Sequence, residues 1–222
     1  MKPLALFDLD HTLLSGDSDE LWCDFLMDEG VLDRAEFEPR NADMVRRYRA
    51  ASVTPQEFSD FYVGTLAGRT PDEWQGLRER FLRGVVLPLI PASARALVES
   101  HRARGELVVM TTATNRYITE LTAHDLQIAD LIATDAELVE GRFTGRTTGV
   151  PNMREGKVTR LQQWLAAHSM PASMLAAATF YSDSTNDLPL LRAVGHAVAV
   201  DPDAGLRAEA AERGWEVLRL AR

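Results

Sequence analysis

The chain has 222 residues, of which 45% are hydrophobic, enough for a sizeable core in one large domain or in a domain with an insertion. Its 24 basic and 33 acidic residues give a formal net charge of −9, which argues against a partner such as nucleic acid or an anionic membrane. The single cysteine, Cys23, cannot form an internal disulfide, which fits a reducing compartment. Asp8 and Asp10 interrupt the apolar N-terminal run far below membrane-spanning length, so we expect a cytoplasmic protein.

Short apolar runs alternate with amphipathic segments along most of the chain. Strands are expected in the run that leads into Asp8 and in 106–111, 131–134, 177–181, 197–200 and 215–220. Helices are expected at about 91–104, 115–125, 155–168, 185–194 and 204–213, and alternating polarity over 137–144 predicts a hairpin. Because strand and helix alternate, the connections are right-handed crossovers in a parallel sheet covered on both faces. The sequence therefore predicts a doubly wound α/β fold.

One long segment, from about residue 15 to residue 87, contains helix signals but no convincing strand. Thr54 and Thr70 each precede a proline and lie three residues before a glutamate, a pattern typical of helix N-termini. Ser18 could begin an earlier helix. We therefore expect a helical cap inserted after the first strand. The expected boundaries are 15–87 for the cap, with 1–14 and 88–222 for the α/β core.

Polar residues gather where the expected strands end, and ligands of open parallel sheets bind beyond those carboxyl ends. The first strand runs into Asp8-Leu-Asp-His-Thr12, whose two carboxylates resist ionisation unless a cation lies between them. The second strand is followed by Thr111-Thr-Ala-Thr-Asn115, and the strand near 180 by Ser182-Asp-Ser-Thr-Asn-Asp187. Lys157 lies at the start of a helix and can supply a cation. This arrangement indicates a site for a phosphate group.

The donor set also indicates a metal. The side chains of these motifs offer oxygen atoms as ligands. Mg²⁺ binds few protein carboxylates and keeps waters and a substrate phosphate oxygen in its coordination shell. A transition metal more often brings histidine or cysteine, and the five histidines show no metal-ligand spacing. We therefore expect Mg²⁺ as the cofactor.

Four motifs, in this order, resemble those of the haloacid dehalogenase superfamily: DLDHT, the threonine of TTATN, the lysine of EGKVT, and DSTND. The helical segment after the first motif resembles the cap of the phosphoserine phosphatase-like branch, subfamily IB. The resemblance covers nearly the whole chain. It implies a Mg²⁺-dependent phosphomonoester hydrolase that acts on a small soluble phosphorylated metabolite through an aspartyl-phosphate intermediate. A catalytically idle relative used for binding or regulation, and a phosphotransferase, are the alternatives.

The resemblance implies roles for the acidic residues. Asp8 would be the nucleophile and Asp10 the general acid, which then activates the hydrolytic water. The metal site would be formed by Asp8, by the backbone carbonyl of Asp10 and by Asp183. Asp187 would act on the metal through water or would orient Lys157.

The resemblance also implies ligands for the phosphoryl oxygens. Thr112 and Lys157 would hold them, and Asn186 would add a hydrogen bond. We prefer Thr112 to Thr111 because Thr112 would lie where the helix starts, one residue past the apolar run. Thr114 and its neighbour Asn115 are interpreted as an ordinary helix N-cap.

Asp17, nine residues after the nucleophile, is a candidate for substrate recognition. In the phosphoserine phosphatase-like branch an acid at this separation faces the amino group of the substrate. The usual glutamate is an aspartate here, which puts phosphoserine in doubt and makes an amine-bearing phosphate without a carboxylate, such as histidinol phosphate, at least as plausible. In the other interpretation Asp17 caps the helix that begins near Ser18. The sequence leaves the substrate and the oligomeric state open.

Overall fold

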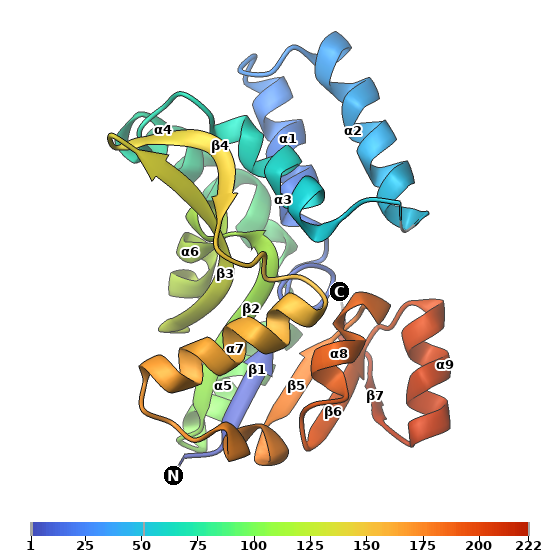
Figure 1. Ribbon diagram of the computed structural model, residues 1–222. Coiled ribbons are helices and arrows are strands. Elements are labelled where there is room, and N and C mark those ends of the chain that lie inside the picture. The colour runs from blue at the N-terminus through green and yellow to red at the C-terminus, as the bar shows by residue number, and fades with distance from the viewer. Residues whose placement is uncertain (1, 51, 222) are drawn as a thin grey trace.

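The computed structural model describes residues 2–50 and 52–221 and shows a seven-stranded, mostly parallel sheet with helices on both faces (Figure 1). The strands are β1 (Leu4–Phe7), β2 (Leu107–Asn115), β3 (Asp130–Val139), β4 (Arg142–Thr148), β5 (Thr179–Ser182), β6 (His196–Val200) and β7 (Glu216–Leu218). Their order is β4-β3-β2-β1-β5-β6-β7; β3 and β4 pair antiparallel, whereas the other neighbours pair parallel. The α/β prediction is thus confirmed. The chain winds to opposite sides of β1, so the topological switch point lies at the carboxyl end of β1.

Helices fill the long segment between β1 and β2 and the later crossovers. The α-helices are α1 (Ser18–Asp28), α2 (Arg34–Arg49), α3 (Pro55–Val63), α4 (Pro71–Phe81), α5 (Ala92–Ala103), α6 (Arg116–Asp125), α7 (Glu155–Ala167), α8 (Leu188–Leu191) and α9 (Ala204–Arg213). Short 3₁₀ turns lie at Gly64–Leu66, Leu87–Leu89, Ala172–Ala177 and Thr185–Asp187, and a π-helical turn at Leu82–Val86. Figure 1 shows α1, α2 and α3 standing above the carboxyl end of the sheet.

The central strand β1 connects two hydrophobic layers. All four of its residues are buried, because successive side chains of a strand point to opposite faces and both faces are covered. Leu4 and Leu6 belong to the cluster that includes residues of α7, whereas Ala5 and Phe7 belong to the cluster that includes residues of α5. The rigid sheet core therefore ends directly beneath Asp8.

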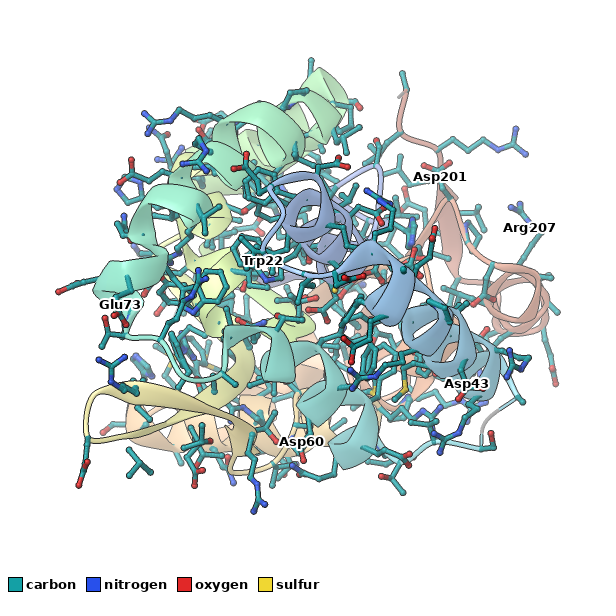
Figure 2. All side chains as sticks on the ribbon, turned by 90° about the horizontal axis from the view of Figure 1, so that it is seen from above. Trp22, Asp43, Asp60, Glu73, Asp201 and Arg207 are labelled. Atoms are coloured by element: carbon teal, nitrogen blue, oxygen red, sulfur yellow. The ribbon has the colours of Figure 1, made fainter. Side chains whose placement is uncertain are left out.

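The segment predicted as a cap is helical, and no strand occurs among its described residues. Thr54 and Thr70 are N-caps as expected, and Thr70 forms the complete capping box with Glu73. Trp22 on α1 packs into the same hydrophobic cluster as Phe7, and Figure 2 shows it in the interior of the molecule. Cap and core thus share buried contacts, and the boundaries at residues 15 and 87 remain a prediction.

Two elements differ from the prediction. Strand β2 continues to Asn115 instead of ending near residue 111, because its last residues pair with Thr134 of β3 beyond a bulge. The helix expected over 185–194 is a 3₁₀ turn followed by the four-residue α8. The chain must turn back by Gly195, whose N–H donates to the carbonyl of Leu175, so that β6 can pair with β5.

The hairpin predicted around Glu140-Gly141 is present as β3 and β4, and both turn residues have positive φ, as a two-residue hairpin turn requires. In the described part of the chain no single helix has the length and apolar composition to cross a membrane. One pair of segments, Pro71–Leu89 and Ala92–Ala103, passes that test only when its two parts, bent by 93°, are counted together.

Candidate active site

A cavity of about 240 Å³ lies where β1 and β5 end. The core contributes Asp8, Asp10, Arg154, Lys157, Asp183, Asn186 and Asp187 to its lining, among other residues. The helical segment contributes Asp17, Asp19, Glu20, Val45, Tyr48, Phe58 and Tyr62. The core and the helical segment therefore both contribute acidic side chains to the cavity, and the cavity is enclosed only where the two meet.

Asp8 is the first residue after β1. Its N–H donates to the carbonyl of Tyr181 at 3.0 Å, so the chain is still in register with β5 where the carboxylate leaves the sheet. The side chain is buried, and its Oδ1 lies 2.7 Å from Nζ of Lys157, while Oδ2 lies 3.1 Å from Oγ1 of Thr12. Burial raises the pKa of Asp8 well above its usual value, and Lys157 acts in the opposite direction.

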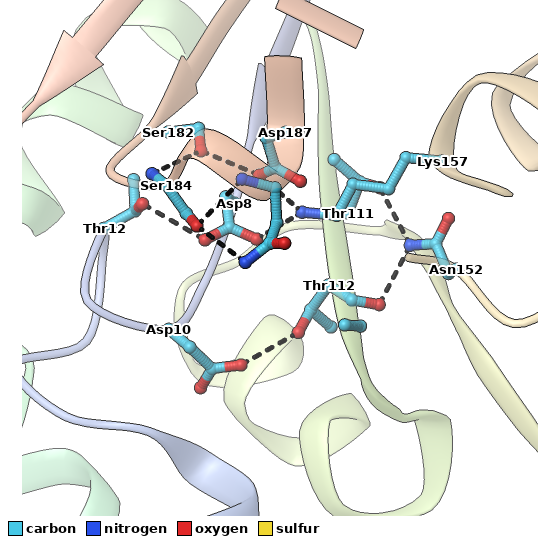
Figure 3. A network of polar contacts seen from close by, with 12 residues as sticks. Asp8, Asp10, Thr12, Thr111, Thr112, Asn152, Lys157, Ser182, Ser184 and Asp187 are labelled. Carbon is cyan, nitrogen blue, oxygen red and sulfur yellow. Dashed lines mark hydrogen bonds and ion pairs between the residues drawn. The ribbon is translucent and has the colours of Figure 1, made fainter. Parts of the chain in front are cut away.

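Lys157 binds a second carboxylate as well. Its Nζ lies 2.7 Å from Oδ2 of Asp187, and that oxygen also accepts a hydrogen bond of 2.7 Å from Ser182 (Figure 3). Burial alone would favour the neutral amine, but Asp187 and Asp8 raise the pKa of Lys157 above its usual value, so it is a cation. Ser182, the last residue of β5, therefore orients Asp187.

Asp183 shares a hydroxyl group with Asp8. Oγ1 of Thr12 lies 3.1 Å from Oδ1 of Asp183 and 3.1 Å from Oδ2 of Asp8, and it accepts from the N–H of Asp183 at 3.1 Å. One hydroxyl proton can satisfy only one of the two carboxylates at a time. Burial, followed by the charge of Asp187, raises the pKa of Asp183 to about 7. Such a pair of crowded oxygen donors fits a hard divalent cation.

Asp10 faces a different set of donors. Its carboxylate accepts hydrogen bonds from the N–H of Ser18 at 2.7 Å, from Oγ1 of Thr112 at 3.1 Å and from Oγ1 of Thr114 at 3.0 Å. Figure 3 shows the side chain turned toward Thr112 and away from the cluster around Asp8. The structure thus joins Asp8, Asp183, Asp187 and Lys157 through hydrogen bonds and ion pairs. The Asp10 carboxylate lines the same cavity but has other partners.

The two candidate threonines of β2 point to opposite sides of the strand, as neighbours in a strand do. Oγ1 of Thr112 donates to Asp10, whereas Oγ1 of Thr111 accepts from the amide of the buried Asn152. The reason given for Thr112, that it starts a helix, is wrong, because β2 continues to Asn115 and α6 starts after it. Thr112 lies on the site's side of the strand, and its role as a phosphate ligand remains a prediction.

The N-cap interpretation fails for Thr114 and is confirmed for Asn115, whose side chain accepts from the N–H of Ile118. Thr114 is two residues beyond Thr112 on the same face of β2 and contacts Asp10 and the buried Asp19. Because period-two alternation identifies such residues, a longer predicted strand would have revealed Thr114.

Asn186 lies at the border between the core and the helical segment. Its Nδ2 donates to the hydroxyl of Tyr48 at 2.7 Å, and its Oδ1 accepts from Nε of Arg154 at 3.3 Å. Neither Tyr48 nor Arg154 was singled out from the sequence, because no motif contains them. The position of Tyr48 depends on how α2 docks against the loop after β5, whereas Arg154 lies in the turn before α7.

Asp17 is the N-cap of α1 and accepts from the N–H groups of Asp19 and Glu20 at 2.9 and 3.0 Å. It also lines the cavity, so capping and contact with a ligand are compatible. Burial, together with the charge of Asp10, raises the pKa of Asp17 to about 8.

Comparison with known proteins identifies the family. Residues 5–192 match the haloacid dehalogenase-like hydrolase family. A histidinol-phosphatase of Neisseria meningitidis serogroup C is 40% identical to this chain over 99% of it and 100% of the relative. The phosphoserine phosphatase SerB1 of Mycobacterium tuberculosis is 31% identical over 98% of this chain and 71% of the relative.

Solved structures share the fold. A protein of unknown function from Bordetella pertussis Tohama I is 44% identical, with a TM-score of 0.94 over 98% of each chain. A phospho-aspartyl intermediate analogue of phosphoserine phosphatase is 15% identical and shares the fold, with a TM-score of 0.70 over 100% of this chain and 94% of that one. The chain belongs to the haloacid dehalogenase-like hydrolase family. Within that family it is an enzyme of the phosphatase class.

Proposed function

We propose that this phosphatase hydrolyses the phosphomonoester of a small soluble metabolite by way of an aspartyl-phosphate on Asp8. The observation that carries the proposal is the position of Asp8, a buried carboxylate directly after the central strand, with Lys157 at 2.7 Å and Thr12 at 3.1 Å. A carboxylate held in this way faces a small cavity, and α2 and α3 leave limited room for a macromolecule above it.

The reaction has two steps. A carboxylate oxygen of Asp8 forms a bond to phosphorus while the bond from phosphorus to the ester oxygen breaks, and Asp10 donates a proton to that leaving oxygen. Asp10 then takes a proton from water, whose oxygen bonds to phosphorus as the bond to Asp8 breaks, which releases inorganic phosphate. Lys157, Thr112 and Asn186 stabilise the charge on the phosphoryl oxygens.

Mg²⁺ is the proposed metal, and when bound it supplies charge stabilisation for the phosphoryl oxygens. Asp8, Asp183 and the backbone carbonyl of Asp10 are its proposed ligands. Asp187 acts through Lys157, because its Oδ2 already accepts from Lys157 and Ser182. Within residues 2–50 and 52–221 no three His, Cys, Asp or Glu side chains form a complete metal cage. The proposal therefore includes waters and a substrate oxygen in the shell, as Mg²⁺ usually has.

An amine-bearing phosphate, such as histidinol phosphate or phosphoserine, is the proposed substrate class. Asp17 and Asp19 both line the side of the cavity that faces the helical segment. Asp19 is only 5% exposed, and its Oδ1 has no hydrogen-bond partner among the described residues, so the carboxylate can accept from a further donor. Tyr48 and Phe58 provide aromatic surface beside these acids. The name of the Neisseria relative supports histidinol phosphate in particular.

The nucleophile and the metal are tested together. Phosphate release from a generic aryl phosphate is measured with EDTA and with added Mg²⁺, for the wild type and for Asp8→Asn. We expect activity only in the wild type with Mg²⁺, and inhibition by beryllofluoride, which mimics a phosphorylated aspartate. Full activity of purified, undeamidated Asp8→Asn, or full activity after exhaustive chelation, would contradict the proposal.

The substrate class is tested with three esters, histidinol phosphate, phosphoserine and an amine-free phosphate, on the wild type and Asp17→Asn. The variant should lose kcat/KM for the amines and keep it for the amine-free ester. Asp24→Asn, an exposed position on the same helix, is the matched control. An equal loss on all three esters, or no loss on any, would refute amine recognition by Asp17.

A further inference from the structure

Arg154 has a backbone conformation that normally requires glycine. The N–H of Gly156 donates to the carbonyl of Met153 at 2.9 Å, and Arg154 between them has φ +53° and ψ −124°. These values define the first central position of a type II′ turn, where glycine is strongly preferred because a Cβ atom is strained there. An arginine at this position costs stability, and such costs are concentrated at functional positions.

The strained turn places the Arg154 side chain on the wall of the active-site cavity. Its Nε lies 3.3 Å from Oδ1 of Asn186, and its guanidinium carbon lies 5.8 Å from the centre of the Tyr48 ring. Both partners are neutral, and no ion pair joins Arg154 to any carboxylate of the described residues. The Arg154 guanidinium therefore lies on the cavity wall without an ion-pair partner among the described residues, although carboxylates also line the cavity.

The other cation of the cavity is in a different situation. Lys157, in the first turn of α7, is already bound to two carboxylates at 2.7 Å each. Two of the three N–H donors of Lys157 already go to Asp8 and Asp187, so one remains for a phosphoryl oxygen. A guanidinium, by contrast, presents several donors in a plane that matches two oxygens of a phosphate.

We propose that Arg154 is a substrate-binding residue whose guanidinium contacts the non-bridging oxygens of the phosphoryl group. This inference rests on the proposed phosphatase reaction at Asp8 and adds a ligand for its substrate. From this position, directly before α7, the Arg154 side chain reaches the cavity beside Asn186 and Tyr48.

The test measures the binding of inorganic phosphate, the product and simplest probe, by calorimetry in the presence of Mg²⁺. Arg154→Gly suits the turn and removes the charge, so it should weaken phosphate binding roughly ten- to hundred-fold. The same variant should raise the Tm of the ligand-free protein by about 2 to 4 °C, because the backbone strain is relieved. Arg154→Lys, which keeps the charge but not the planar fork, should lie between Arg154→Gly and the wild type.

Ser169→Gly is the matched control, since Ser169 also has a positive φ, of 55°, but is exposed at the end of α7 and outside the cavity lining. It should leave the phosphate affinity unchanged. In turnover, Arg154→Gly should raise KM for a phosphomonoester more than it lowers kcat.

Three results would overturn the proposal. The first is an unchanged phosphate affinity in Arg154→Gly. This includes the case in which the variant changes only the preference between esters with and without a carboxylate, because Arg154 would then bind the substrate carboxylate and not the phosphoryl group. The second is an equal loss of affinity in Tyr48→Phe and Arg154→Gly, which would show that both variants act through Asn186, the residue that Tyr48 and Arg154 both contact. The third is a wild type that neither binds phosphate nor hydrolyses any phosphomonoester, which would refute the proposed reaction at Asp8 itself. In the first two cases the wild type is active, and only the proposed role of Arg154 is refuted.

Discussion

Asp8 and Asp10 stand two residues apart, yet their carboxylates have different partners. Asp8 contacts Lys157 and Thr12, whereas Asp10 accepts from the N–H of Ser18 and from hydroxyl groups of β2. The difference arises because the chain leaves β1 after Phe7, so the alternation of the strand no longer determines where Asp10 points. Substitutions at the two positions should therefore have different consequences.

Asp10→Asn should leave the fold intact and slow turnover by roughly 10²- to 10⁴-fold, the usual contribution of a general acid and base. The amide can still accept from the N–H of Ser18, which preserves the local structure. With an ester of a good leaving group, intact-mass measurement should detect phosphorylated protein, because water is no longer activated. Asp8→Asn under the same conditions should show no phosphorylated protein. An Asp10→Asn enzyme with wild-type kcat would contradict the assignment.

Lys157→Met should destabilise the protein by about 3–5 kcal/mol, because it leaves two buried carboxylates without their cation. Lys157 and Asp187 are each only 3% exposed, so water cannot replace the lost partner easily. The double variant Lys157→Met/Asp187→Asn should recover part of this loss, since one of the stranded charges is removed, but should remain inactive. Urea unfolding followed by circular dichroism measures both effects. Equal stability of the single variant and the wild type would show that the ion pairs do not hold the site.

The metal-free protein should become less stable as pH rises from about 4 to 8. Folding raises the pKa of Asp17 to about 8 and that of Asp183 to about 7, while an unfolded aspartate titrates near 3.9. In this window the folded state holds protons that the unfolded state has released, so its stabilisation is complete below the unfolded pKa and is lost as pH passes the folded pKa values.

Urea unfolding in EDTA at pH 5 and pH 8 measures this slope. Asp17→Asn should flatten it, because the amide does not titrate. A metal-free wild type that is more stable at pH 8 than at pH 5 would show that the carboxylates ionise without penalty in the folded protein.

Gly156→Ala should cost about 1–3 kcal/mol of stability, because a Cβ atom there would lie 2.0 Å from the carbonyl oxygen of Pro151 and the turn that places Arg154 and Lys157 would have to move. Gly76→Ala is the control, since Gly76 is exposed within α4 with nothing within 4 Å of its Cβ position. That change should stabilise the protein by about 0.5–1 kcal/mol. Thermal unfolding of both variants distinguishes a specific clash from a general response to alanine.

Local sequence patterns were enough to predict the alternation of strands and helices, the helical segment after β1 and the positions of the polar motifs. These features are local: the apolar period of a strand, a Thr-Pro helix start or a Glu-Gly turn is set by neighbouring residues. The same local patterns placed Asp8, Lys157 and Asp183 at element ends, from which the family resemblance could be identified.

Which of these side chains meet depends on the packing of distant segments. Thr112 and Thr114 reach Asp10 across about a hundred residues of chain, and β2 extends that far because it pairs with β3. Ser182 orients Asp187, and Arg154 faces the cavity through a turn that its own residue type disfavours. Local preference could not predict these contacts, because each depends on the register and docking of segments far apart in sequence, whose packing energy outweighs the local cost.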